Sequence, residues 1–369
     1  MKFEDVFGLE DLKQKLVSNV RQDRLAHAQL FLGPEGSGNL AMALALTQLI
    51  YCQNPQENDS CGVCSSCVKN QKLVHPDVHF TYPTVGAREK STTFIENWRE
   101  ILEIHPYFNT TDWLNNIAKN ENKNPNITKE ETRDVLSKLA LKPFEGEAKT
   151  LIIWMPEYLD KVGNALLKFI EEPPHKTYIF LVANNFDALL TTITSRTQLV
   201  KIPSYTSEDV STYLGSKYNL ESNRAESIGF LSEGNLNSAI NLVESVENNY
   251  AEIFRNWMLS CYKNDLNGVS QITDEVAKFG RNQIQVFLTN GLKILRESLL
   301  YSTIADYDVK FEDEYKQFIM KFSKTLSAQN IESSYSKIND AIYHVQRNAN
   351  AKITLFNLSL ALHKNFIRN

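Results

Sequence analysis

Short apolar runs, rich in branched and aromatic residues, recur along the first 203 residues, and each ends in turn or polar residues. The clearest are AQLFLG at 28–33, KTLIIWM at 149–155 and YIFLVANN at 178–185. Helical patterns such as NALLKFIEE at 164–172 lie between them. The alternation predicts an α/β fold with a mostly parallel sheet covered by helices. Ligands of such folds bind at the carboxyl ends of the strands.

Helical patterns alone continue after residue 203. Thr206 or Ser207 is placed to cap the first of these helices, because an acidic pair follows in its first turn. Farther along, apolar residues recur at spacings of four and three, which is the period of one helix face. This stripe consists of Ile284, Leu288, Leu292, Leu295 and Leu299. A similar pattern at 335–366 surrounds the polar break RNANAK, so a helical bundle is expected and the stripe is interpreted as its core.

One segment of the α/β region departs from this pattern. Residues 109–128 are rich in asparagine and poor in aliphatic side chains. Such a composition predicts an exposed excursion, which belongs to an insertion at about 85–128.

The bulk composition narrows the possible classes of protein. The chain has 369 residues, 42% hydrophobic and 22% charged, which is enough for two or three globular domains. Its formal net charge of −5 argues against a general electrostatic grip on nucleic acid, so any such contact should be local or shared with partners. The N-terminal residues lack a signal-peptide pattern, and no apolar run reaches the length of a membrane span. A cytoplasmic protein with no membrane partner is expected.

The sequence GPEGSGNL at 33–40 is close to a phosphate-binding loop. Gly33 and Gly38 keep the glycine spacing of that motif, and Gly36 adds flexibility. Asn39 stands where the motif has its lysine, and Leu40 stands where it has the hydroxyl that ligates magnesium. Two interpretations stay open: weak nucleotide binding by the backbone of the loop, or a plain turn between strand and helix.

The acidic partner of such a loop is also missing. In nucleotide hydrolases an apolar strand ends in acidic residues that hold magnesium and orient water. Here TLIIWMPEYLD ends its strand with Trp154, Met155 and Pro156, and Glu157 and Asp160 follow too late to replace the acids. The losses together predict a chain that does not hydrolyse nucleotide.

Four of the five cysteines form a cluster with the spacing C-x8-C-x2-C-x2-C. Two close pairs of thiolates suit tetrahedral Zn²⁺, and four sulfur ligands leave no position for a substrate, so the site should be structural. The predicted ligands are Cys52, Cys61, Cys64 and Cys67. Cys261 is interpreted as a small buried side chain, and His75 as a turn residue before a strand.

A single arginine, Arg196, lies in the polar stretch TTITSRTQLVKIP. From the residues alone it has two interpretations. It is either a surface ion pair or a finger that stabilises transition-state charge in a neighbouring subunit.

These motifs, in this order, resemble the delta-prime subunits of bacterial DNA polymerase III clamp loaders, a family of the AAA+ superfamily. The landmarks are RLAHAQLFLGPEGSG, the cysteine cluster with HPD, ALLKFIEEPP at 165–174, TTITSR and RNAN at 347–350. They span most of the chain, and NALLKFIEEPP with SR is the most specific of them.

The resemblance implies three domains. These are an AAA+ α/β domain at 1–203 with a zinc module at 52–67, a helical lid at 204–246, and an all-α collar at 247–369 through which five subunits form a ring. It also implies that the chain assembles with motor and clamp-opening subunits and reaches the sliding clamp and primer-template DNA through the complex.

The resemblance also implies roles for single residues. The family's S-R-C motif falls on Ser195, Arg196 and Thr197, which keeps the arginine that reaches the ATP site of the adjacent motor subunit. The sensor arginine of motor subunits falls on Asn237. A non-hydrolysing subunit that donates Arg196 is therefore expected, with an ATP-hydrolysing motor-type subunit as the alternative.

Overall fold

The computed structural model describes residues 1–86, 88–117, 125–159, 166–174, 176–245, 250–309, 313–325, 327–347 and 349–367. They form two compact units. The first contains residues 1–205 and 235–237, and the second contains residues 206–234 and 238–369. The expected boundary between lid and collar, at 246, lies outside the described residues.

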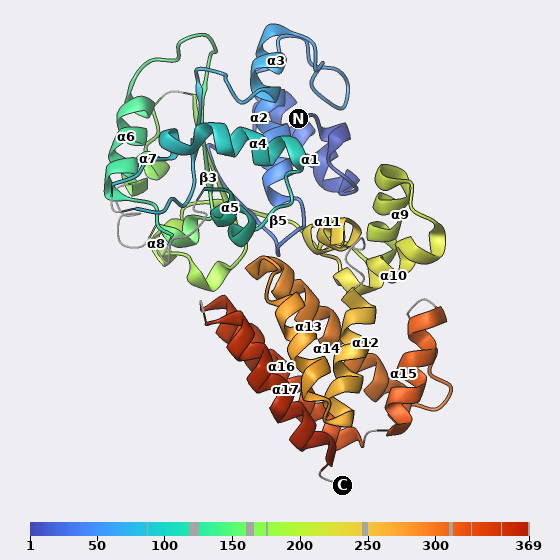
Figure 1. The fold of residues 1–369 in the computed structure, drawn as a ribbon. Helices are drawn as coiled ribbons and strands as arrows, with labels where there is room; N and C mark the ends of the chain where they lie inside the picture. The colour runs from blue at the N-terminus through green and yellow to red at the C-terminus, as the bar shows by residue number, and fades with distance from the viewer. Residues whose placement is uncertain are drawn as a thin grey trace. The chain divides into compact units, whose positions relative to one another are not determined.

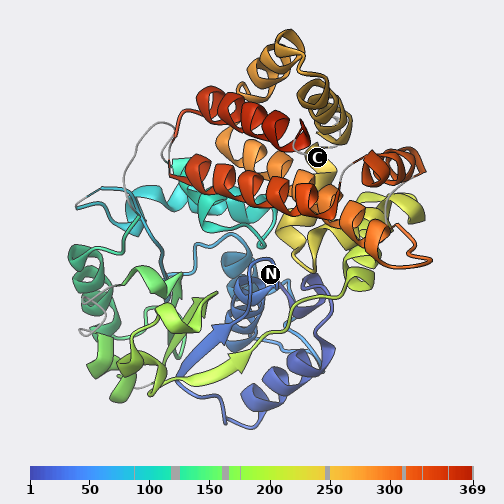
Figure 2. The same cartoon turned by 90° about the horizontal axis from the view of Figure 1, so that it is seen from below.

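A five-stranded sheet forms the centre of the first unit, with the order β2-β3-β4-β1-β5 and every pairing parallel. The strands are β1 (Ala28–Leu32), β2 (Val78–Thr81), β3 (Lys149–Trp154), β4 (Thr177–Ala183) and β5 (Gln198–Lys201). Figure 2 shows β1 and β5 side by side. The three apolar runs are thus β1, β3 and β4, as predicted, because a parallel sheet buries both faces of its central strands.

Helices cover both faces of this sheet (Figure 1). They are α1 (Glu10–Arg21), α2 (Asn39–Ile50), α3 (Ser65–Gln71), α4 (Ile95–Ile104), α5 (Thr110–Ile117), α6 (Lys129–Ala140), α7 (Leu167–Glu171) and α8 (Thr191–Thr194). Helix α2 is buried along almost its whole length and contacts β1, β3 and β4. On the opposite face, α6, α7 and α8 share a core with the sheet through Leu139, Ile170 and Ile193. The predicted α/β fold is confirmed.

The expectation that residues 109–128 are an exposed excursion is wrong for its described part. Trp113 in α5 is 0% exposed and Ile127 is 3% exposed. Asparagine-rich composition gave the misleading signal, because two apolar side chains suffice to anchor a polar segment when each is fully buried. Residues 118–124 lie outside the described part of the chain.

The second unit is entirely helical in its described residues. Its helices are α9 (Ser207–Tyr218), α10 (Ser222–Ser232), α11 (Leu236–Ser245), α12 (Tyr250–Lys263), α13 (Leu266–Val276), α14 (Arg281–Thr303), α15 (Asp313–Thr325), α16 (Ala328–Gln346) and α17 (Ala351–Ile367). Thr206 caps α9, accepting a hydrogen bond from Asp209 N at 3.0 Å. The predicted stripe lies on α14, and four of its five residues are buried, so the interpretation as core is confirmed.

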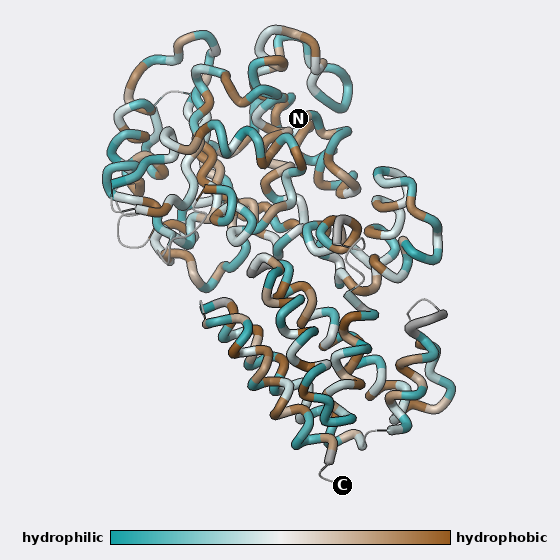
Figure 3. Tube along the Cα trace, in the orientation of Figure 1, coloured by the Kyte–Doolittle hydropathy of each residue, from teal (hydrophilic) through white to brown (hydrophobic). Residues whose placement is uncertain are grey.

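Brown and teal segments alternate along these helices in Figure 3, as expected of amphipathic helices in a bundle. Helix α16 packs against α14 and α17, and the break between α16 and α17 falls at RNANAK as predicted. Within the described residues, no helix combines the length and the hydropathy that a membrane span requires.

Candidate functional site

The glycine loop at 33–38 lies at the carboxyl edge of the sheet, between β1 and α2. Gly33 N donates to Ala183 O at the end of β4, at 3.2 Å. Gly36 and Gly38 have φ values of +72° and +85°, in the left-handed region that favours glycine. The loop therefore joins strand to helix at the edge where such folds bind ligands, a position that both interpretations share.

Asn39, in the place of the motif's lysine, ties the loop to the neighbouring strand. Its Nδ2 lies 3.1 Å from Ala183 O, 2.8 Å from Asn184 Oδ1 and 3.3 Å from Gly33 O. Its Oδ1 accepts from Leu40 N at 2.9 Å, and the residue is 8% exposed. The polar atoms of Asn39 are therefore used by the fold itself and offer no charge to a phosphate.

A short segment of the same unit, residues 235–237, covers the loop. Leu236 N donates to Gly36 O at 3.3 Å, and a Cβ on Gly36 would collide with Asn235 Oδ1. Asn237 is 2% exposed and donates through Nδ2 to Asp112 Oδ2 at 2.8 Å. Asn237, which the resemblance aligns with the sensor arginine, thus binds a carboxylate of the same chain.

Carboxylates gather beside the loop. Burial of the Glu35 carboxyl group and the charge of Asp112 raise the pKa of Glu35 above its ordinary value, although much of the Glu35 side chain is exposed. Glu157 Oε1 accepts from Asn184 N at 2.7 Å and from Asn185 N at 2.9 Å. Burial raises the pKa of Glu157 despite these bonds. When ionised, these carboxylates repel a phosphate group, whereas a working loop attracts one.

Trp154 belongs to a buried aromatic cluster. It lies at the end of the strand where nucleotide hydrolases have acidic residues. It is 3% exposed, and its ring centroid lies 5.4 Å from that of Trp98 and 5.1 Å from that of Phe108. Trp98 packs in turn against Trp113 at 5.3 Å. The side chain that replaces the acid therefore fixes α4 and α5 to the end of β3. Asp160 lies outside the described residues.

Arg196 is on the surface, just after α8. Its Nε forms an ion pair with Glu171 Oε1, and its Nη1 donates to Thr192 O at 3.0 Å and to Ser195 Oγ at 3.2 Å. The Arg196 side chain is 38% exposed. None of these contacts is with the glycine loop, so within the described residues the two predicted sites are separate.

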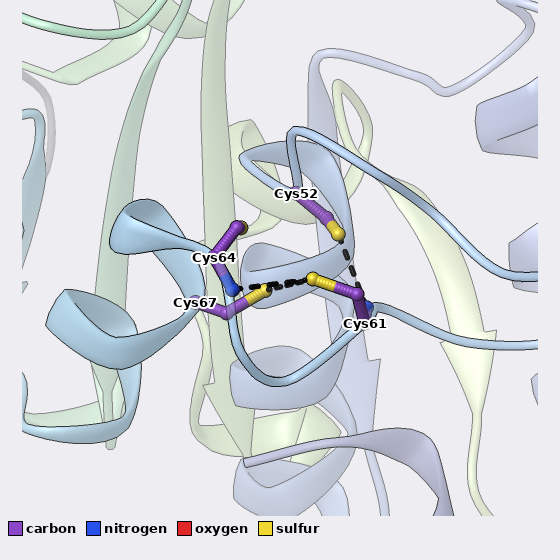
Figure 4. A group of neighbouring side chains, drawn as sticks. All are labelled: Cys52, Cys61, Cys64 and Cys67. Atoms are coloured by element: carbon purple, nitrogen blue, oxygen red, sulfur yellow. Dashed lines mark hydrogen bonds between the residues drawn. The ribbon is translucent and has the colours of Figure 1, made fainter.

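The four clustered cysteines converge as predicted (Figure 4). Their sulfur atoms all lie within 4.8 Å of one another, and Cys61 Sγ is 3.9 Å from Cys67 Sγ. Sulfur atoms bound tetrahedrally to Zn²⁺ lie about 3.8 Å apart, since each Zn–S bond is about 2.3 Å. Backbone N–H groups of Val63 and Cys64 lower the pKa of Cys61 to about 6, which favours its thiolate form. Burial raises the pKa values of Cys52 and Cys67, so the fit to a metal rests on the geometry of the four sulfur atoms. The donor set fits a closed four-sulfur metal site.

Asp77 in the HPD motif has a role that sequence reasoning missed. Its carboxylate accepts backbone hydrogen bonds from Phe144 at 2.5 Å, Glu145 at 2.9 Å and Gly146 at 2.7 Å. These bonds lower the pKa of Asp77, although burial alone would raise it. The only signal in the sequence was the tripeptide itself, because its partners lie about 67 residues later.

His75 and Cys261 occupy the places that were predicted for them. His75 is 4% exposed, and its carbonyl accepts from Val78 N at 3.1 Å in the turn before β2. Its ring is outside the four-cysteine cluster. Cys261 is 1% exposed.

Comparison with known proteins points to one family. The model of the family described as "DNA polymerase III, delta subunit" matches residues 8–206, more than half of the chain. A delta' subunit of DNA polymerase III from Escherichia coli K12 is 31% identical over 189 residues, which cover 50% of this chain and 45% of that protein. A delta' subunit from Bacillus subtilis is 27% identical over 184 residues, which cover 50% of this chain and 44% of that protein.

More distant similarities were also found. A tau subunit of DNA polymerase III from Bacillus subtilis is 24% identical over 250 residues, covering 66% of this chain and 37% of that protein. Among solved structures, a gamma subunit-related protein from Thermotoga maritima has a TM-score of 0.42 and 14% identity, with 95% of this chain and 99% of that chain covered. The chain spans less than half of the length of the delta' relatives that it matches.

Proposed function

The chain belongs to the DNA polymerase III delta subunit family, and from this premise we propose that it is a delta'-type subunit of the replicative clamp loader that does not hydrolyse ATP. In this role it assembles with motor and clamp-opening subunits, and the complex loads the sliding clamp on primer-template DNA. The net charge of −5 supports indirect rather than general electrostatic contact with DNA.

One observation carries the non-hydrolysing role: the glycine loop is closed by side-chain and backbone groups of the same chain. Asn39 is hydrogen bonded to the end of β4, and Gly36 O is taken by Leu236 N. Asn237, in turn, is bonded to Asp112. An incoming phosphate would have to displace this packing and face the nearby carboxylates without a lysine to balance their charge.

The isolated chain is therefore expected to show no magnesium-dependent ATPase activity and to bind ATP with a Kd weaker than about 1 mM. Asn39→Lys should restore neither property, because the covering segment and Trp154 remain in place. Isothermal titration calorimetry and a phosphate-release assay would measure both. A control for folding is the circular dichroism spectrum of each protein.

Tight ATP binding by the wild-type chain would contradict the closed loop. ATPase activity of the wild-type chain would instead support the motor-type alternative. The observation that favours this alternative is the 24% identity to a tau subunit.

The proposed contribution to the motor is Arg196, acting in trans. Its exposed position after α8 supports contact with a neighbouring subunit, since a finger has to leave its own domain to reach a phosphate. The arginine would stabilise charge that develops on the transferred phosphoryl group in the adjacent motor subunit.

For the cysteine cluster we propose structural zinc. When bound, Zn²⁺ would be held by four thiolates and would cross-link the segment 52–67, with no open position for catalysis.

We expect about one equivalent of zinc per chain, because four thiolates make one tetrahedral set. Cys64→Ala should lose the metal and raise hydrogen exchange within about 52–77 while ring assembly is kept. Elemental analysis, exchange mass spectrometry and size-exclusion chromatography would measure these effects, and Cys261→Ala, outside the cluster, is the matched control. Protein purified under reducing conditions without chelator that contained no zinc would contradict the proposal.

A further inference from the structure

The guanidinium group of Arg196 is held by contacts within its own chain, which can be assigned to each of its N–H donors. A guanidinium group has five N–H donors in a fixed fork. The Nε donor faces Glu171, and the two donors of Nη1 face Thr192 O at 3.0 Å and Ser195 Oγ at 3.2 Å. Only the two donors of Nη2 have no hydrogen bond to the described residues.

The arrangement leaves one nitrogen of the fork for an external acceptor. Its N–H groups belong to a cation and can donate charge-assisted hydrogen bonds to an anion such as a phosphoryl group. The other contacts come from the chain's own elements: Thr192 lies in α8, Ser195 directly follows it, and Glu171 is the last residue of α7.

We propose that Glu171 is a positioning residue for Arg196, which holds the guanidinium so that Nη2 faces a phosphoryl oxygen of the neighbouring subunit. This inference rests on the proposed finger role. Glu171 is suited to it because Pro173 and Pro174 follow closely and restrict the backbone where α7 ends.

A positioned arginine acts better than a free one for an entropic reason. A long exposed side chain samples many rotamers, so fixing it in one of them costs conformational entropy. Each hydrogen bond that fixes the side chain before the reaction removes part of this entropic cost. Glu171 is 48% exposed and Arg196 is 38% exposed, so their ion pair is screened by solvent and its expected effect is moderate.

The test uses a loader reconstituted with motor subunits, clamp and primer-template DNA. Glu171→Ala should lower the single-turnover rate of ATP hydrolysis at the adjacent site by about threefold to fivefold, with KM for ATP unchanged. Glu171→Gln keeps an acceptor for Nε and should recover part of the rate. Glu172→Ala removes the neighbouring exposed carboxylate, for which the structure gives no contact with Arg196, and is the matched control.

The decisive variant combines Glu171→Ala with Arg196→Ala. If Glu171 acts through Arg196, the double variant should be no slower than Arg196→Ala alone. A further loss in the double variant, or a wild-type or faster rate for Glu171→Ala while Arg196→Ala is impaired, would overturn the positioning role alone. A wild-type rate for Arg196→Ala would overturn the finger role itself, so the two failures are distinguishable.

Discussion

Arg196→Ala in a reconstituted clamp loader is expected to slow hydrolysis at the adjacent motor site by about 10³-fold, the lower end of what an arginine finger contributes. The reason is electrostatic, because the guanidinium group would no longer balance the charge that develops on the transferred phosphoryl group. Rapid chemical quench under single-turnover conditions would measure the rate. The amplitude of the fast phase should fall by the contribution of the one ATP site that Arg196 serves. Arg196→Lys should recover little, because an ammonium group cannot keep the contacts with Glu171, Thr192 and Ser195 that hold the guanidinium while one nitrogen stays free.

This result has to be separated from a failure to assemble. Size-exclusion chromatography should show the same ring for wild type and variant, since Arg196 is exposed and its loss leaves no buried group unpaired. Arg133→Ala, which removes an exposed arginine from α6, is the control for the loss of one positive charge. An unchanged hydrolysis rate in a normally assembled ring would remove the finger from the proposal.

Trp154→Asp is expected to lower the free energy of unfolding by about 4 kcal/mol or more, and to restore no ATPase activity. Loss of a buried tryptophan alone costs about 3–5 kcal/mol, and an unpaired carboxyl group among aromatic rings adds a desolvation cost. The acid found at this position in nucleotide hydrolases would stand where Trp98 and Phe108 pack. Urea denaturation followed by tryptophan fluorescence and circular dichroism would measure the change.

Trp154→Phe is the matched control for this prediction. It keeps an aromatic ring and introduces no polar group, so the loss should be only about 1–2 kcal/mol. If Trp154→Asp were as stable as the wild type, the aromatic cluster would not explain why the acid is absent from this chain.

The degree to which the sequence anticipated the site differs from residue to residue. The sequence shows that Asn39 replaces the lysine of the motif. It does not show that the Asn39 side chain hydrogen bonds to Ala183 and Asn184, about 145 positions away. Glu171 was visible only as part of the landmark ALLKFIEEPP, and its ion pair with Arg196 required both segments to be placed in space. Sequence patterns report neighbours within a few turns or strands, whereas these partners meet only through tertiary packing.

The sequence by itself determined the α/β alternation, the helical C-terminal part and the four cysteines of the cluster, and it narrowed the helix cap to Thr206 or Ser207. Each of these depends on local periodicity, local hydrogen bonding or close spacing of one residue type. Only the tertiary structure decided that residues 235–237 close the glycine loop and that Trp154 belongs to an aromatic cluster. The physical reason is that burial and hydrogen-bond partners of these groups depend on contacts between segments far apart in the chain, which no local pattern encodes.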